Sequence, residues 1–488
     1  MSEMTESTNF GAKHVMPPTT WKTKFFYGFG SVAYGVKDNG FAYLLLFYYS
    51  QVLGLSAQLA GLGMLIAMIS DALTDPIVGR VSDNFHSKWG RRHPFMYASA
   101  IPIAISYYFL WNPPSDLSQI QLFAYFVTLA VIVRTCITLY EIPSSALIAE
   151  LTDDYDERTS FMGFRHFFGW WGGLSMSVLA YTVFLVATDD QERGVLVAEG
   201  YQGYSIAASA VMVFAVMVSC LGTHKYIPYL RKPPEKKPFS LARTVDEMKE
   251  TLLEPAFLTL FVAGFFAAMA GGLTTSMDIY LNTYFWGLDS SQLGTMSMGY
   301  FLSALLALML AIQIGKRFNK KHGAIMIGII AAVIAPLPYI LHFLDMFPAK
   351  GSDQLMVALM TIRVIDVALI IASGILVGSM IADVVEQSEL KTGRRSEGVF
   401  FAARNFIAKS VTGVGIILTT TLLTVIEFPN GADPADVPVA LSNDLAIFYA
   451  PLSFAVYMIS ILVLFGYKIS RAKHEENVRI LAEEGLNA

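Results

Sequence analysis

Residues 57–81 read AQLAGLGMLIAMISDALTDPIVGRV, an apolar stretch long enough to cross a membrane as a helix, and it contains two carboxylates, Asp71 and Asp75. Their spacing of four places both on one face of the helix, about one turn apart, and Pro76 loosens the backbone beside them. A charge in the middle of a bilayer costs about 2.5–3.5 kcal/mol on insertion scales, so such residues usually face a cavity or a partner. The stretch therefore predicts a membrane-spanning helix with a functional site inside it.

The rest of the chain repeats this apolar pattern. Of 488 residues, 54% are hydrophobic and only 15% are charged, which is typical of a polytopic membrane protein and argues against a soluble enzyme or a nucleic-acid-binding protein. We expect an all-α membrane protein with twelve transmembrane helices in two six-helix bundles. The predicted spans are 24–50, 57–81, 94–112, 119–149, 160–187, 202–222, 255–285, 291–315, 323–345, 354–384, 397–427 and 444–468.

A polar segment separates the two halves of the chain. It includes the run RKPPEKKP at 231–238, which is typical of a linker. We expect an amino-terminal six-helix bundle with its tail at 1–222, a cytoplasmic linker at 223–254, and a carboxy-terminal six-helix bundle with its tail at 255–488. The first twenty or so residues lack the apolar region and cleavage site of a removable signal peptide.

Lys and Arg are distributed unequally between the two sides of the predicted membrane. The tails, the linker and the loops on one side carry 25 of them, whereas the other side carries two, Arg193 and Lys350. Because loops rich in Lys and Arg stay in the cytoplasm, we expect both termini to be cytoplasmic and the protein to lie in the cell (inner) membrane.

Basic turns occur at equivalent places in the two halves. Residues 79–83 (GRVSD) and 89–92 (WGRR) follow the second span, and residues 315–321 (GKRFNKK) follow the eighth. Two parallel repeats of this kind are typical of a transporter in which one bundle rocks against the other. The alternative is that each turn only sets the topology.

Further polar residues interrupt the first and fourth spans. Lys37 and Asp38 lie in the first span, and Thr138 and Glu141, three apart, share a face of the fourth. Oxygen ligands suit Na⁺, whereas two close carboxylates can instead share a proton. We expect the cation site to consist of Asp71, Asp75, Thr138 and Glu141; the alternative for each acid is a structural ion pair.

Basic residues occur in the same layer. Arg165 lies near the start of the fifth span, where it could simply reach toward the lipid headgroups, and Lys409 lies deeper, in the eleventh span, beside Asn405. Arg134 and Arg363, in the fourth and tenth spans, receive no assignment from the sequence.

Several motifs in these positions resemble the glycoside-pentoside-hexuronide:cation symporters of the major facilitator superfamily, the family of the melibiose permease. The resemblance extends from Lys37 to Lys409. The motifs, in order, are DALTDPIVG at 71–79, SD at 82–83, KWGRRHPF at 88–95, EIP at 141–143, ADVVE at 382–386 and ELKTGRRSEG at 389–398.

The resemblance implies roles for individual residues. Positions around the coupling cation, Na⁺ if the protein is sodium-coupled, match Asp71, Asp75, Thr138 and Glu141. The solute-binding positions match Lys37, Asp38, Glu141, Arg165 and Lys409, to which we add Asn405. Cytoplasmic gating charges match Asp383, Glu386, Glu389 and Arg395, and we expect these to pair with Asp83, Arg91 and Arg92 across the bundle interface.

The sequence also departs from the melibiose permease. Glu141 stands where that protein has Asp, and Ser145 and Gly374 stand where it has Trp. The loss of two stacking surfaces argues against a galactoside and leaves room for a larger solute or one of another class.

The expected function is symport of sugars or glycosides coupled to Na⁺ or H⁺ by alternating access, without covalent chemistry and with no cofactor beyond the coupling cation. The expected partners are a small polar solute and membrane lipid, and we expect a functional monomer. An alternative is cation-coupled transport of another organic solute, such as a lysolipid or an organic anion. An embedded enzyme would need a nucleophile or metal motif, and a nontransporting sensor would need an added cytoplasmic domain.

Overall fold

The computed structural model describes residues 17–152, 154–230, 255–392 and 397–469, together with five residues between 473 and 480. These described residues form helices and connecting turns and contain no strand. Most of the predicted linker lies outside the described residues. The all-α architecture expected from the sequence is therefore confirmed.

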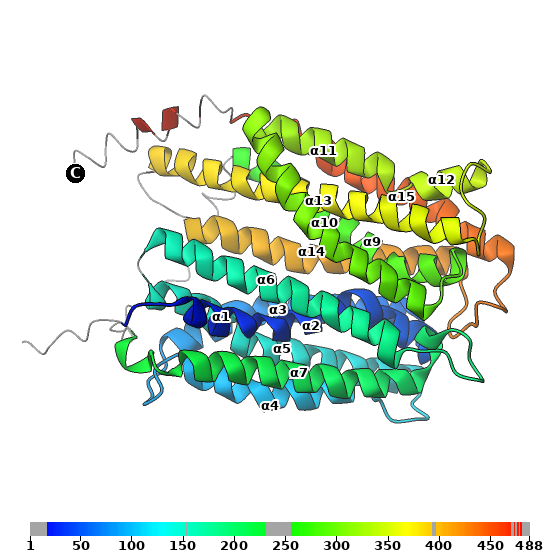
Figure 1. Ribbon diagram of the computed structural model, residues 1–488, viewed down its shortest axis with the longest axis horizontal. Coiled ribbons are helices and arrows are strands. Elements are labelled where there is room, and N and C mark those ends of the chain that lie inside the picture. Colours follow the sequence, from blue (N-terminus) through cyan, green and yellow to red (C-terminus); the bar gives the residue numbers. More distant parts are fainter. Residues whose placement is uncertain are drawn as a thin grey trace, which may run out of the picture.

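The helices run side by side along one axis of the molecule (Figure 1). By length and composition, eight of the described helical segments can cross a membrane, and they begin with α3, α5, α7, α9, α10, α11, α13 and α15. Each of the twelve predicted spans contains a described helix. The helix bounds are α1 Trp21–Phe29, α2 Ser31–Asn39, α3 Ala57–Asp83, α4 His93–Leu110, α5 Gln119–Leu151, α6 Tyr155–Leu179, α7 Ala198–His224, α9 Pro255–Tyr280, α10 Ser290–Arg317, α11 Lys320–Ile334, α12 Leu337–Phe343, α13 Asp353–Thr392, α14 Glu397–Val425 and α15 Val439–Leu464.

The first helical stretch is irregular. α1 and α2 meet at Gly30 and continue into two π-helical turns, η1 (Gly40–Leu45) and η2 (Tyr48–Val52). The stretch is followed by Gly54, whose φ of 71° is accessible to glycine without strain. Because π turns occur frequently at functional sites, the irregularity after Lys37 and Asp38 agrees with their predicted role.

Glycine contacts hold equivalent helices together in the two halves. In the first half α2 packs against α6, and a Cβ added at Gly35 would overlap the carbonyl oxygen of Gly169. In the second half α9 packs against α14, and a Cβ added at Gly272 or Gly415 would overlap the backbone of the facing helix. These pairs are the first and fifth spans and the seventh and eleventh spans, so the contact repeats at the same place in each half.

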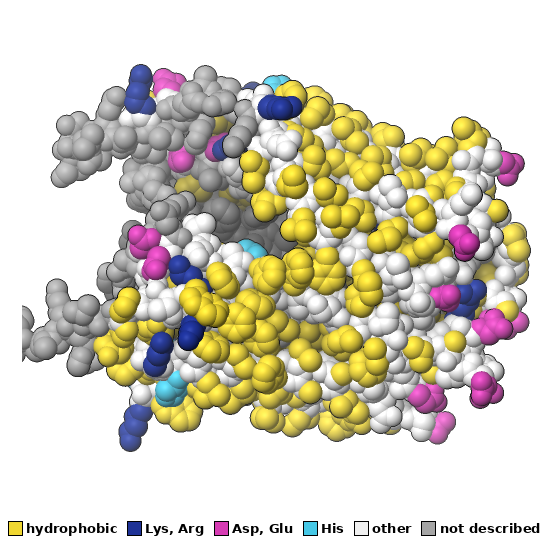
Figure 2. Space-filling model, viewed as in Figure 1, with side chains coloured by type: hydrophobic (Ala, Val, Ile, Leu, Met, Phe, Trp, Pro, Cys, Tyr) yellow, Lys and Arg dark blue, Asp and Glu magenta, His cyan; other side chains and the backbone are white. Residues whose placement is uncertain are grey.

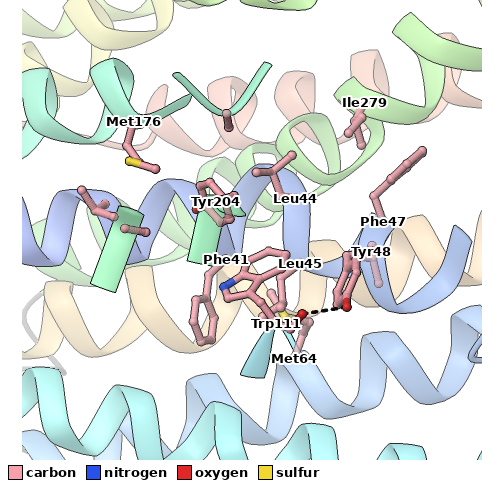
Figure 3. Packing of buried hydrophobic residues seen from close by; sticks show 14 of the residues in the cluster. Phe41, Leu44, Leu45, Phe47, Tyr48, Met64, Trp111, Met176, Tyr204 and Ile279 are labelled. Atoms are coloured by element: carbon pink, nitrogen blue, oxygen red, sulfur yellow. Dashed lines mark hydrogen bonds between the residues drawn. The ribbon is translucent and has the colours of Figure 1, made fainter. Parts of the chain in front are cut away.

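One hydrophobic core spans both halves. In the first half Tyr48 donates a hydrogen bond of 2.8 Å to the carbonyl oxygen of the fully buried Trp111 (Figure 3). The same cluster includes residues of α9 and α14, and the ring of Phe47 lies 5.2 Å from that of Tyr280, edge to face. A second cluster lies entirely in the second half, on α9, α10, α11, α13 and α15 and the residues after α15.

The surface has an apolar side and two unlike ends (Figure 2). Large exposed hydrophobic side chains, such as Ile101 and Phe214, cover the side, as a lipid-facing surface requires. Lys and Arg gather at one end, which we call the basic end; it includes the turn at 88–92. Asp and Glu dominate the other end, which we call the acidic end; it is formed by loops 185–197 and 426–438. In this view a hollow opens at the basic end between the two halves.

Candidate functional site

The two carboxylates of α3 converge on one hydroxyl of α5. Thr138 lies 3.1 Å from Asp71 and 3.0 Å from Asp75, measured from its Oγ1 to a carboxylate oxygen of each. α3 and α5 pack closely along their length, which brings the fourth predicted span to the second. Three of the four residues predicted for the cation site, Asp71, Asp75 and Thr138, thus lie together in the structure.

Two cations complete this cluster. Arg134 of α5 donates to Asp71 over 2.9 Å, and Lys409 of α14 lies 2.6 Å from Asp75 and 3.3 Å from Asp71. The sequence predicted Lys409 for the solute site and left Arg134 unassigned. Arg134 lies four residues before Thr138, a spacing that places both on the same face of α5 and was available as a signal.

The side chains of the cluster differ in solvent exposure. The side chains of Asp71 and Arg134 are 3% and 6% exposed, whereas Asp75 and Lys409 are 19% and 29% exposed. A deeply buried ion pair must be complete, because removing one partner leaves an uncompensated charge. Asp71 with Arg134 therefore forms the buried part of the cluster, and Asp75 with Lys409 forms its more exposed part.

The pair between Lys409 and Asp75 joins the two halves of the chain. Asp75 belongs to α3 and Lys409 to α14, and these two helices pack against each other. All the acidic oxygens and the hydroxyl of the cluster are hard ligands of the kind that Na⁺ accepts. In this arrangement the ammonium group of Lys409 contacts both carboxylates that the sequence predicted for the cation site.

Lys37 and Asp38 lie side by side on α2 and form an ion pair. The Lys37 side chain is 3% exposed, and that of Asp38 is 57% exposed although α2 lies midway along the first helical stretch. A carboxylate at this depth faces water or a partner rather than lipid. Asp38 is therefore the accessible acid of the first helical stretch.

Arg165 is buried inside the first half and does not extend toward a lipid headgroup. Its guanidinium donates to the Ser144 hydroxyl over 3.0 Å and to the Glu141 carbonyl oxygen over 3.3 Å, and it lies over the ring of Tyr34. Glu141 also interacts electrostatically with Lys409 and Arg165. Glu141 thus links the cation cluster to Arg165.

Four of the predicted gating charges, Asp83, Arg91, Arg92 and Asp383, contact residues of their own half. Arg91 lies 2.7 Å from Glu150, a residue that the sequence reasoning missed; Arg92 contacts Glu150 and lies 3.2 Å from Asp83. In the second half Asp383 accepts from Lys320 over 2.7 Å. The expected pairing across the interface stays a prediction for a different conformation.

Several predicted residues cannot be placed. The side chains of Asn405 and Glu389 and the whole of Arg395 lie outside the described residues. Glu386 is half-buried on α13.

The helical fold and a set of charges buried among membrane-length helices define a multi-pass membrane transporter. Residues 26–471 match the family described as MFS/sugar transport protein, and the chain belongs to this family, which consists of transporters and not of enzymes. This confirms the resemblance drawn from the motifs.

Individual relatives extend over nearly the whole chain. The isoprimeverose transporter of Lactiplantibacillus pentosus is 24% identical, over 96% of this chain and 92% of its own length. The sodium-dependent lysophosphatidylcholine symporter 1 of Gallus gallus is 22% identical, over 94% of this chain and 89% of its own. Among solved structures, the inward open form of the xylose transporter XylE from E. coli has a TM-score of 0.62 at 14% identity, covering 94% of this chain and 99% of that one, which shows a common fold.

Proposed function

We propose that this protein is a cation-coupled symporter of sugars or glycosides that works by alternating access. The observation that carries the proposal is the buried cluster of Asp71, Asp75, Thr138 and Lys409, which joins the two halves beside the accessible Asp38. The names of relatives that transport isoprimeverose and other sugars support the solute class. The proposed mechanism requires no cofactor other than the coupling cation.

The geometry suggests how coupling works. A cation that binds Asp75 competes with the ammonium of Lys409 for the same oxygen atoms. Once displaced, Lys409 becomes available to solute hydroxyl groups near Asp38, and the link between α3 and α14 changes. Because linkage is reciprocal, a solute that engages Lys409 raises the affinity of the protein for the cation.

The distribution of charge supports an orientation. The basic end corresponds to the loops that positive-inside topology retains in the cytoplasm, so we assign both termini to the cytoplasm and the protein to the cell (inner) membrane. With this orientation the hollow in Figure 2 opens inward. We assign transport to the monomer, surrounded by lipid.

The test is uphill uptake by the purified protein in liposomes. Labelled monosaccharides, disaccharides and glycosides are offered with an imposed Na⁺ or proton gradient, and one of these gradients should drive accumulation. Asp75→Asn should abolish accumulation while the protein stays folded. The matched change Asp444→Asn, on α15, should leave it intact. Unaltered accumulation by Asp75→Asn contradicts the proposal.

A second candidate is transport of a polar solute that carries an apolar chain. The second half contains a partly open cavity of about 330 Å³ between α9, α11, α13 and α15, lined mainly by apolar side chains and small residues. Gly264, Gly271 and Gly374 face open space in it, and Gly374 replaces the Trp of the melibiose permease. Large voids are rare in protein interiors, and an apolar cavity of about 150 Å³ already binds benzene.

This second candidate is tested by comparing alkyl glycosides with the free sugar. If the cavity holds an alkyl chain, Gly374→Leu should weaken binding of the alkyl glycoside and spare the free sugar. Gly163→Leu, at an exposed glycine of α6 that also faces open space, is the control. Equal loss for both ligands, or for neither, excludes the cavity as part of the solute site.

A further inference from the structure

A second group of ionisable side chains lies inside the second half. Arg363 of α13 forms an ion pair with Asp278 of α9, and its other terminal nitrogen lies 3.6 Å from Asp366, one turn further along α13. Asn282 donates to Asp278 over 3.1 Å. None of these residues belongs to the cation or solute site predicted from the sequence.

The charges of this group do not balance. In the first cluster the carboxylates of Asp71 and Asp75 contact two cations, Arg134 and Lys409, and a third, Lys37, interacts electrostatically with Asp71. In the second group two carboxylates share one guanidinium. One negative charge is therefore left over, in a place where an uncompensated charge costs many kcal/mol and is usually neutralised instead.

Asp366 is the carboxyl group that carries the excess. Its side chain is 1% exposed, and within the described part of the chain neither of its oxygens accepts a hydrogen bond. By contrast, the Asp278 side chain is 13% exposed and lines a small polar pocket between the halves, opposite Asn39. The distance of 3.6 Å to Arg363 exceeds that of a hydrogen bond. Of the two acids, Asp366 has fewer contacts that stabilise its charged form.

Neutral hydroxyl groups surround Asp366 on the other sides. The tyrosines close enough to interact with it electrostatically are Tyr300 of α10, Tyr339 of α12, and Tyr449 and Tyr457 of α15. With Asp278 of α9 and Arg363 of α13, these are the titratable groups that face it among the described residues. Phenols can donate or accept hydrogen bonds but bring no positive charge. This environment suits a neutral carboxylic acid.

We propose that Asp366 is a proton-binding site of the second half, separate from the cation cluster at Asp71 and Asp75. With the proton bound, Arg363 is free to pair with Asp278 at the interface between the halves. When the proton leaves, Arg363 must neutralise both carboxylates, and its ion pair with Asp278 weakens. The site thus connects proton occupancy to a polar pocket that both halves line. The proposal concerns proton binding alone and does not depend on the solute or on the coupling ion at Asp75.

The test follows the protonated carboxyl group directly. Infrared difference spectra of the reconstituted full-length protein are recorded without solute while the pH is raised from about 6 to about 9, a range in which buried carboxyl groups titrate. The wild-type protein should lose a carbonyl stretching band equivalent to one carboxylic acid. Asp366→Asn, which resembles the protonated acid in shape, should remove this band.

Two further variants make the test specific. Asp278→Asn leaves Arg363 to neutralise Asp366 alone, so the band should be absent at pH values where the wild-type protein still shows it. Asp444→Asn, on the neighbouring α15, should retain the wild-type band. The proposal is overturned if Asp366→Asn keeps the full band, or if Asp278→Asn titrates like the wild-type protein. Should Asp366→Asn fail to fold, the result with Asp278→Asn still decides the question.

Discussion

At the scale of single residues, the buried pair of Arg134 and Asp71 is the least replaceable contact of the cation cluster. Arg134→Gln removes the charge that compensates a carboxylate only 3% exposed, so we expect a loss of about 3–5 kcal/mol in the free energy of unfolding. Thr138→Val, which removes one hydroxyl, should cost about 0.5–1.5 kcal/mol. Thermal unfolding of the purified protein measures both.

A double variant separates charge from packing in this prediction. Asp71→Asn combined with Arg134→Gln has no unpaired charge, so it should recover much of the stability that Arg134→Gln loses. A double variant that is less stable than Arg134→Gln would show that the side chains act mainly through packing.

Asp38 provides a second test at this scale. Its accessible carboxylate lies beside Lys37 in the predicted solute site. We expect Asp38→Ala to weaken solute binding by about 1–3 kcal/mol, because groups arranged to hydrogen-bond hydroxyls then lack a partner. Calorimetry measures solute and cation binding separately, and cation binding should change less. Normal solute affinity in this variant would remove Asp38 from the solute site.

The sequence could identify the acids of the first cluster but not their partners. Asp71, Asp75 and Thr138 follow from charges and spacing inside apolar stretches, which are local properties. Their pairing with Lys409, 334 residues beyond Asp75, depends on how the halves pack. The same holds for Arg363, whose partner Asp278 lies 85 residues earlier on another helix. Hydropathy does not encode such distant contacts.

At the scale of helices, the apolar stretches of the sequence predicted where the helices lie better than they predicted where the helices end. The predicted span 57–81 agrees with α3, Ala57–Asp83, because Ser56 caps its first turn and the polar residues that follow Asp83 end it. The predicted span 354–384 is shorter than α13, Asp353–Thr392, since that helix continues into a polar segment that hydropathy cannot assign. The first span was predicted as one helix, and its π turns gave no signal in the sequence.

The glycine contacts give a prediction about helix packing. Because a Cβ at Gly415 would overlap the carbonyl oxygen of Met269 on α9, a methyl group there can be accommodated only if the helices move apart. We expect Gly415→Ala to destabilise the protein by about 1–3 kcal/mol, and Gly35→Ala to do the same between α2 and α6. Gly163→Ala, which faces open space on α6, should have little effect or slightly raise the stability. Equal thermal stability of all three variants would contradict close packing at these glycines.

At the scale of the whole molecule, the halves touch at the acidic end and separate at the basic end. Tyr284 of the second half donates to Gln51 of the first over 3.0 Å, and both Tyr284 and Phe428 of the second half belong to the shared hydrophobic core. Two ion pairs at the basic end, Arg92 with Glu150 and Lys320 with Asp383, each lie within one half, and a hollow opens there (Figure 2). Alternating access requires the opposite arrangement as well, in which the acidic end opens and the basic end closes.

Two loop contacts at the acidic end should set the balance between these arrangements. Gln191 donates to Asp433 over 2.8 Å, and Arg193 donates to the carbonyl oxygen of Gly287 over 2.8 Å, each across the interface. Each hydrogen bond contributes about 0.5–1.5 kcal/mol, so the double variant Gln191→Leu, Arg193→Leu removes about 1–3 kcal/mol and should shift the equilibrium by roughly 5- to 150-fold toward opening at this end. Spin labels are attached at Ser87→Cys and His322→Cys, which lie at the basic ends of the two halves. The distance between the two labels should become shorter in the double variant. Because the native Cys136 and Cys220 are buried, the labels react selectively with the introduced cysteines. Asp189→Asn, in the same exposed loop, should keep the wild-type distances. If the distance distribution of the double variant equals that of the wild-type protein, these contacts do not control which end of the transporter is open.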